Sequence, residues 1–139
     1  MGFSRAFKPG SMAALAELVC CNVPYSRAAN SAEIAHFRFF LKQFCPEDQD
    51  CKQILMQALA ARRPKPMLSN ALIILRDELA EEDRLPFMDE LIKLRCSLSG
   101  ASPKLCGYTV FAGKFLGIDE RNLNTLFQIA SASIVPKRQ

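Results

Sequence analysis

Apolar residues recur at the three- and four-residue spacing of an α-helix along almost the whole of this 139-residue chain. No stretch alternates apolar and polar residues for long enough to predict a β-strand. Prolines, glycines and short charged stretches interrupt the helical pattern at intervals. The sequence therefore predicts an all-α fold, a compact bundle of about seven short helices.

Capping residues and breaks set the expected bounds of these helices. The segment 67–80 is apolar nearly all round, which is typical of a central helix covered on several sides. Pro86 is tolerated only within a first turn, so the next helix is expected to begin near Asp83. The expected helices are 12–21, Asn30 to Phe44, Pro46 to Arg63, 67–80, Asp83 to Leu98, Ser102 to Gly117, and Asp119 onward.

One helical domain is predicted over 12–135, between a basic N-terminal tail at 1–11 and a basic C-terminal tail at 136–139. Within the domain, residues 36–55 and 109–127 share a pattern of an aromatic-rich helix, a break, an acidic cap and an amphipathic helix. This likeness suggests two pseudo-repeats.

The excess of basic residues lies in the two tails. The net charge is +4, and Arg5, Lys8, Lys137 and Arg138 lie outside the expected helices. Without these four, 14 of the 18 basic residues remain against 14 acidic ones, so the body of the chain is electroneutral. A nucleic-acid-binding domain usually carries its basic residues as a stripe on a folded face. We therefore do not expect a nucleic acid as the partner.

The six cysteines lie mostly within apolar helical patterns, where a free thiol behaves as a small hydrophobic side chain. Cys45 and Cys51 flank the segment PEDQD and can approach each other across a first helical turn. No zinc-binding spacing of Cys and His is present. Because no export signal and no membrane-spanning apolar run are recognisable, we expect reduced thiols, a cytoplasmic location and no transmembrane segment.

Residues 88–127, MDELIKLRCSLSGASPKLCGYTVFAGKFLGIDERNLNTLF, resemble the repeat unit of the TerB-like superfamily. This superfamily includes tellurite-resistance proteins and the N-terminal region of membrane-anchored DnaJ-type co-chaperones. The break at Leu116–Asp119 matches the family pattern, and residues 13–59 correspond to a first repeat. The resemblance implies an all-helical fold and an adaptor role in stress response or chaperone recruitment.

The resemblance also implies an alternative, a metal- or oxyanion-linked stress-response protein. The family's Asp-Gly loop corresponds here to Ser99-Gly100, and its early helical Glu corresponds to Cys106. Hard cations need several oxygen ligands, and this loop supplies no carboxylate. We therefore assign no metal ligand; a metal site would need other carboxylates, such as Glu33 or Asp119.

The leading hypothesis is a non-enzymatic protein-interaction domain with a groove for a partner helix or a basic segment. Phe39 falls away from the apolar stripe of its helix, which favours a role as an exposed anchor. An acidic joint between two expected helices would orient the partner; the simpler explanation of this joint is a solvated connection. The predicted partner-binding residues are Phe39, Asp77, Glu78, Glu81, Glu82 and Asp83.

A third hypothesis is an enzyme that uses a cysteine together with His36, the only histidine. Cys45 or Glu33 could serve as the partner of His36, but a polar residue on the flank of an aromatic helix face explains it more simply. No phosphate-binding loop, nucleotide fingerprint, serine elbow or HExxH motif is present. We therefore expect no catalytic residues, no enzymatic activity and no cofactor.

Overall fold

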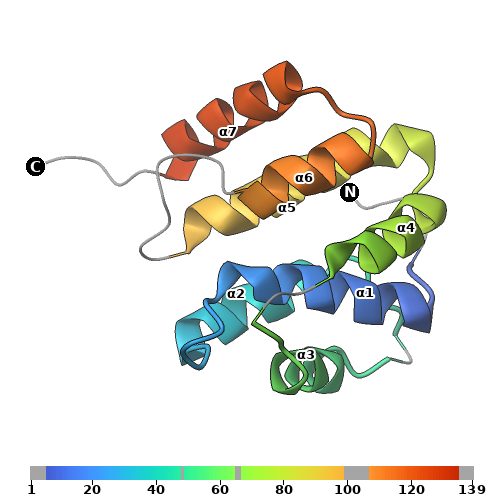
Figure 1. The fold of residues 1–139 in the computed structure, drawn as a ribbon, viewed down its shortest axis with the longest axis vertical. Helices are drawn as coiled ribbons and strands as arrows, with labels where there is room; N and C mark the ends of the chain where they lie inside the picture. The colour runs from blue at the N-terminus through green and yellow to red at the C-terminus, as the bar shows by residue number, and fades with distance from the viewer. Residues whose placement is uncertain (1–5, 48, 65–66, 99–106, 135–139) are drawn as a thin grey trace, which may run out of the picture. The chain divides into compact units, whose positions relative to one another are not determined.

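The computed structural model describes residues 6–47, 49–64, 67–98 and 107–134 (Figure 1). These residues form seven α-helices and one short 3-10 helix, and no strand occurs among them, so the predicted all-α fold is confirmed. No helix in these ranges combines the length and the hydropathy that a membrane crossing requires. The helices are α1 (Pro9–Val19), η1 (Cys20–Asn22), α2 (Ser31–Lys42), α3 (Cys51–Ala60), α4 (Leu68–Glu78), α5 (Glu81–Ser97), α6 (Gly107–Phe115) and α7 (Glu120–Ile134).

The chain divides into two compact units, Met1–Asp83 and Arg84–Gln139, whereas the sequence predicted one helical domain over 12–135. The first unit holds α1 to α4 with η1, and the second holds most of α5 together with α6 and α7. The division falls near the start of α5, just after its acidic first turn.

Helix α1 is the centre of the first unit, where it packs against α2, α3 and α4 (Figure 1). Met12 and Leu15 of α1 are completely buried. The sequence instead favoured the segment 67–80 as the central helix, and that expectation is wrong. Ile73 and Ile74 of α4 are 40% and 42% exposed, because the apolar residues of this helix extend beyond the face that packs on α1.

The N-terminal segment is part of the first unit from Phe7 onward. The ring of Phe7 is buried 4.9 Å from the ring of Phe44, and its backbone N–H donates to the Phe44 carbonyl at 2.8 Å. Helix α1 then begins at Pro9, because proline suits the first turn of a helix. The N-terminal tail is therefore shorter than the predicted 1–11, and the tail at 136–139 lies outside the described residues.

Two helices begin at residues other than those expected. Helix α3 begins at Cys51 rather than Pro46, because the Asp50 side chain accepts the backbone N–H of Gln53 at 3.1 Å and caps the helix there. Helix α5 begins ahead of Asp83, with an acidic first turn that suits the positive end of the helix dipole. The expected cap of the sixth helix at Ser102 lies outside the described residues.

In the second unit, α6 and α7 pack against each other at short range. A Cβ atom added at Gly113 would lie 2.5 Å from Cδ1 of Leu123, so the missing side chain allows this approach. Gly117 has a φ of +87°, and its N–H donates to the Lys114 carbonyl at 3.0 Å. The N–H of Ile118 donates to the Gly113 carbonyl at 2.9 Å, which completes a Schellman motif and confirms the predicted helix end at Gly117.

The two segments that the sequence paired as pseudo-repeats share a local arrangement. Helices α2 and α3 pack together in the first unit, and α6 and α7 pack together in the second. Asp50 caps α3, and Asp119 caps α7 by accepting the backbone N–H of Asn122 at 2.9 Å. Each segment is therefore a helix, a connector and an Asp-capped helix.

Candidate docking surface on helix α2

A capping box and an arginine hold the N-terminus of α2. The backbone N–H of Glu33 donates to the Asn30 side chain at 2.8 Å, and the backbone N–H of Asn30 donates to the Glu33 carboxylate at 2.9 Å. Arg27 donates two further hydrogen bonds to this carboxylate, at 2.9 and 2.7 Å. These bonds fix the direction in which α2 leaves its connector.

Arg62 fastens the same connector from the end of α3. Its Nη2 donates to the Arg27 carbonyl at 2.8 Å, and its Nη1 donates to the carbonyls of Pro24 and Val23 at 3.1 and 3.3 Å. Val23 is buried, and a backbone carbonyl outside a regular helix needs such a partner when it is withdrawn from water, whereas the hydrogen bonds to Pro24 and Arg27 are exposed. The fork of the guanidinium therefore ties α3 to the segment that leads into α2.

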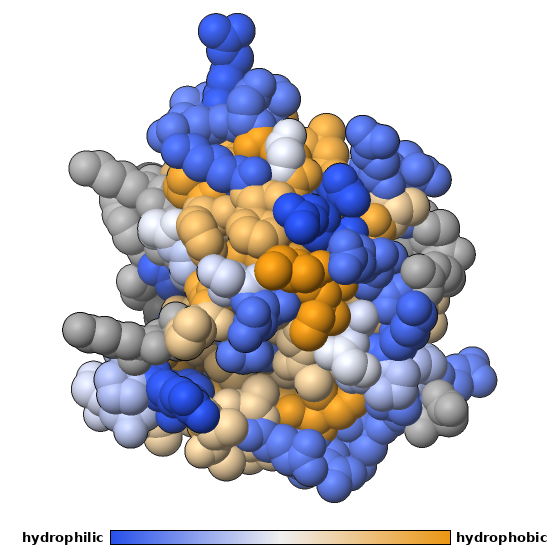
Figure 2. All heavy atoms as spheres, turned by 45° about the vertical axis from the view of Figure 1, so that its right-hand side comes forward, coloured by the Kyte–Doolittle hydropathy of each residue, from blue (hydrophilic) through white to orange (hydrophobic). Residues whose placement is uncertain are grey.

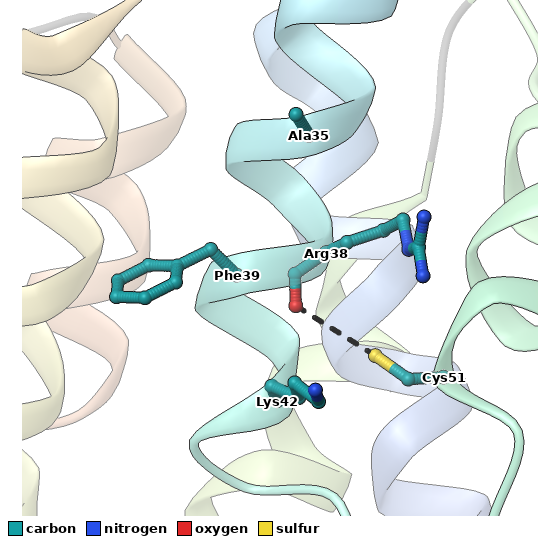
Figure 3. A pocket seen from close by; sticks show the side chains of 5 residues that line it. All are labelled: Ala35, Arg38, Phe39, Lys42 and Cys51. Atoms are coloured by element: carbon teal, nitrogen blue, oxygen red, sulfur yellow. Dashed lines mark hydrogen bonds between the residues drawn. The ribbon is translucent and has the colours of Figure 1, made fainter.

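One face of α2 forms an open hollow with the start of α3 (Figure 3). Ala35, Arg38, Phe39 and Lys42 share the i, i+3, i+4, i+7 spacing of one helix face, and Cys51 of α3 completes the lining. The Cys51 thiol also donates to the Arg38 carbonyl at 3.8 Å (Figure 3). We call this surface, defined by these residues, the α2 hollow.

Phe39 is the large apolar residue among those that line the α2 hollow. Its side chain is 76% exposed and points away from the helix axis (Figure 3), whereas Phe37 and Phe40 of the same helix are buried. The prediction that Phe39 lies off the buried stripe is confirmed. Other apolar residues also reach the surface, where they lie among hydrophilic ones (Figure 2).

The α2 hollow is also cationic. Arg38 and Lys42 are exposed, and neither forms an ion pair with a carboxylate in the described part of the chain. None of the described residues that line the hollow is acidic. The surface therefore offers an apolar ring beside two positive charges, which suits a partner that carries apolar and anionic groups side by side.

The size of the α2 hollow limits what it can hold. Its volume is about 190 Å³. Sites for drug-sized ligands and cofactors enclose roughly 300 to 1,000 Å³ and bury most of the ligand, whereas an apolar cavity of about 150 Å³ takes a single benzene ring. The α2 hollow thus fits one or two side chains of a larger partner better than it fits a small-molecule ligand.

The predicted acidic residues do not join Phe39 at this surface, since none of them lines the α2 hollow. Glu78 is buried, and its Oε1 accepts the Ser11 hydroxyl at 2.7 Å and the backbone N–H of Lys8 at 3.1 Å. Glu78 is thus engaged within the first unit, at the junction of α1 and α4. The exposed members of the joint lie at the end of α4 and in the first turn of α5: Asp77, Glu81 and Glu82, with Asp83 half-buried.

The residues considered for a metal site or an enzyme are engaged elsewhere or isolated. The carboxylates of Glu33 and Asp119 accept the capping hydrogen bonds described above. His36 is exposed and has no hydrogen bond to another described residue. The described residues contain no group of three or more His, Cys, Asp or Glu side chains that could hold a metal ion.

Sequence reasoning identified Phe39 but missed its neighbours. Arg38 and Lys42 share a helix face with Phe39, so the basic character of this face could have been inferred from the sequence. Cys51 could not, because it comes from the next helix and its place depends on how α3 packs against α2.

Comparisons with known proteins add no identification. The chain matches no family model, no curated protein and no solved structure. The resemblance of residues 88–127 to the TerB-like superfamily therefore stays a prediction from the sequence.

Proposed function

We propose that this protein is a non-enzymatic interaction domain, an adaptor that binds an acidic, partly apolar segment of a partner protein at the α2 hollow. One observation carries the proposal. A phenyl ring that is 76% exposed shares one helix face with two cationic side chains, Arg38 and Lys42, and none of the described residues that line the hollow is a carboxylate. Exposed aromatic and arginine side chains are the residue types most enriched among the energetic centres of protein interfaces.

The chemistry of the partner follows from this lining. A large apolar side chain of the partner would cover the ring of Phe39, and neighbouring Asp or Glu side chains would pair with Arg38 and Lys42. Apolar and acidic residues alternate at helical spacing on an amphipathic helix, which is a common occupant of such surfaces. The proposal therefore replaces the basic partner that the acidic joint suggested with an acidic one.

The biological setting of the proposal comes from the resemblance alone. A TerB-like domain would place this adaptor in stress response or in chaperone recruitment. The motifs that carry the resemblance lie in residues 88–127, whereas the α2 hollow lies within the segment 13–59 that corresponds to a first repeat, so the docking surface is argued from the lining of the hollow and not from those motifs.

The test is a selection of random peptides displayed on phage, with the full-length protein as the target and the Phe39→Ala variant for counter-selection. Synthetic versions of the enriched peptides are then titrated by fluorescence anisotropy. We expect peptides with Asp or Glu beside an aromatic or large aliphatic residue. Phe39→Ala and Arg38→Glu/Lys42→Glu should each weaken their binding by about tenfold or more, equivalent to about 1.4 kcal/mol.

Two control variants match the test variants in exposure and charge. Met67→Ala removes another apolar side chain, 74% exposed, and Arg63→Glu reverses an exposed charge at the end of α3. Both should leave peptide affinity unchanged. The proposal fails if no peptide survives counter-selection, if the enriched peptides lack acidic residues, or if the controls weaken binding as much as the test variants do.

A further inference from the structure

Part of helix α4 is exposed. The side chains of Ile73 and Ile74 reach the surface, and Asp77 follows them by four and three residues, so the three share one face of the helix. Asp77 is itself exposed. This face therefore carries two branched apolar side chains next to a carboxylate.

Two further carboxylates follow along the chain. Helix α4 ends at Glu78, and Glu81 and Glu82 are exposed in the first turn of α5. Four residues of chain span at most about 14 Å, so the backbone of Glu81 lies near that of Asp77. None of Asp77, Glu81 and Glu82 forms an ion pair with a cationic side chain in the part of the chain that the structure describes. We give the name acidic face to Ile73, Ile74, Asp77, Glu81 and Glu82.

The acidic face complements the α2 hollow in chemistry. The hollow presents an exposed phenyl ring beside Arg38 and Lys42, and neither cation pairs with a carboxylate among the described residues. The acidic face presents exposed isoleucines beside carboxylates. One contact between the two surfaces would therefore pair apolar groups with apolar groups and negative charges with positive ones.

Both surfaces belong to the first unit, but they lie on different helices. The α2 hollow lies on α2 and the start of α3, the acidic face lies on α4 and the start of α5, and α2 and α4 both pack against α1 (Figure 1). No residue of the acidic face lines the α2 hollow. The two surfaces therefore do not meet at the hollow within one molecule, and an acidic face that occupies the hollow comes from another molecule.

We propose that a second copy of this chain docks its acidic face on the α2 hollow. This inference rests on the proposed function, because it names a partner for the same hollow. Ile73 or Ile74 of one copy covers the ring of Phe39 of the other, and the carboxylates of the acidic face pair with Arg38 and Lys42. The contact joins two different surfaces of the chain and is therefore heterologous.

Self-association through this contact is weak and sensitive to salt. The volume of the hollow is about 190 Å³, enough for one or two side chains, so the contact belongs to the small, transient class of interfaces. Its charged side chains are exposed, and salt screens such charges over roughly 8 Å at physiological ionic strength. A second copy and a foreign acidic segment compete for one hollow, so self-association and partner binding exclude each other.

The test measures self-association of the full-length protein by sedimentation equilibrium under reducing conditions, from about 10 µM to about 1 mM, because small interfaces associate weakly. We expect the weight-average mass of the wild type to rise above the monomer mass with concentration and to fall as salt is added. Arg38→Glu/Lys42→Glu reverses the charge of the hollow, and Asp77→Lys/Glu81→Lys reverses the charge of the acidic face. Each should weaken self-association by about tenfold or more, and Phe39→Ala should do so without a change of charge.

A mixture of the two charge-reversed variants gives the sharpest readout. One variant keeps its acidic face and the other keeps its hollow, so the original contact forms only between unlike variants. Mixed in equal amounts, they should associate at concentrations at which each alone is monomeric. Two controls, Arg63→Glu/Arg121→Glu and Glu17→Lys/Glu47→Lys, reverse the same number of charges at exposed positions elsewhere and should each self-associate like the wild type.

Three results would overturn the inference. The wild type stays monomeric over the whole range, or a charge-reversed variant that is folded by circular dichroism self-associates like the wild type, or the mixture stays monomeric. Peptide binding separates such a failure from failure of the proposed function, because Asp77→Lys/Glu81→Lys leaves the lining of the hollow unchanged. If acidic peptides bind this variant while the wild type stays monomeric, the proposed function stands and the second copy is excluded. If self-association requires both surfaces and no peptide binds, the second copy is supported and the foreign partner is excluded.

Discussion

Arg27 and Glu33 face each other through two parallel hydrogen bonds, Nη1 to Oε1 at 2.9 Å and Nη2 to Oε2 at 2.7 Å. The Glu33 side chain is only 6% exposed, whereas that of Arg27 is 47% exposed. The carboxylate also closes the capping box of α2 with Asn30. The Glu33 side chain therefore takes part in both a helix cap and an ion pair. Its partner Arg27 lies on the connector, where the Arg27 carbonyl accepts a hydrogen bond from Arg62.

The first prediction concerns acid stability. The hydrogen bonds from Arg27 lower the pKa of Glu33 from 4.5 to about 2, against the opposing effect of burial. The folded state thus favours the ionised carboxylate. Its contribution to stability is complete above pH 4.5 and is lost as the pH falls toward 2. Glu33→Gln should lower the free energy of unfolding by about 1 to 2 kcal/mol at neutral pH.

Urea unfolding at a series of pH values checks this prediction. The difference in stability between the wild type and Glu33→Gln should stay constant above pH 5 or so and shrink as Glu33 becomes protonated. Glu47→Gln, at an exposed carboxylate on the α2–α3 connector, is the matched control and should follow the wild type at every pH. Parallel pH curves for the wild type and Glu33→Gln would contradict the assigned role.

The second prediction concerns the fork of Arg62. Lysine keeps the charge but cannot reproduce the several directed N–H donors of a guanidinium. Arg62→Lys should therefore release the carbonyls of Val23, Pro24 and Arg27 and destabilise the protein by about 1 to 3 kcal/mol. Limited trypsin digestion followed by mass spectrometry should show cleavage after Arg27 several-fold faster than in the wild type.

The neighbouring residue supplies the control for Arg62. Arg63 is exposed, and Arg63→Lys makes the same chemical change one position along the chain. It should alter neither the urea midpoint nor the rate of cleavage after Arg27. If cleavage after Arg27 is accelerated equally in both variants, the directed hydrogen bonds of the Arg62 guanidinium do not hold the connector.

The third prediction concerns the contact between α6 and α7. Gly113→Ala places a Cβ atom 2.5 Å from Cδ1 and 2.6 Å from Cδ2 of Leu123, so the Leu123 side chain or the helices must move. We expect a loss of about 1 to 3 kcal/mol, measured as a lower urea midpoint. Gly107→Ala, at the start of the same helix with no atom within 4 Å of the added carbon, should change stability by less than about 0.5 kcal/mol. Equal midpoints for the two variants would refute the close approach.

The fourth prediction separates Glu78 from its acidic neighbours. Glu78→Ala removes the acceptor of the Ser11 hydroxyl and the Lys8 N–H in a buried place, so it should cost about 1 to 3 kcal/mol. Asp77→Ala, at an exposed position next to it, should stay within about 0.5 kcal/mol of the wild type. Thermal unfolding by circular dichroism distinguishes these outcomes. If Glu78→Ala leaves the thermal stability unchanged, Glu78 again becomes a candidate for the surface role that the sequence suggested.

Local signals made much of the fold predictable. Asn30 before α2, Asp119 before α7 and Gly117 after α6 each act within a single helical turn, and each lies at the helix end that the sequence indicated. The exposed position of Phe39 was predictable for the same reason, since the spacing of the apolar residues on α2 determines which side of the helix faces the core.

Contacts between segments far apart in the sequence were not predictable in this way. Glu78 and Asp77 stand in one acidic stretch, yet only the packing of α4 on α1 brings Glu78 to Ser11 and leaves Asp77 exposed. The role of Gly113 depends on Leu123 from the next helix. The distances between residues of different helices cannot be read from the sequence, because each of them is set by how whole helices pack.

The sequence by itself determined the all-α class, the caps and ends of several helices and the outward position of Phe39, because these depend on hydrophobic periodicity and on hydrogen bonds within one turn. Only the tertiary structure decided that α1 rather than α4 is the central helix of the first unit, and that Cys51 of α3 lines the α2 hollow. The physical reason is that burial and contact between helices follow from which apolar faces pack together, and many pairings of similar faces are compatible with one pattern of residues.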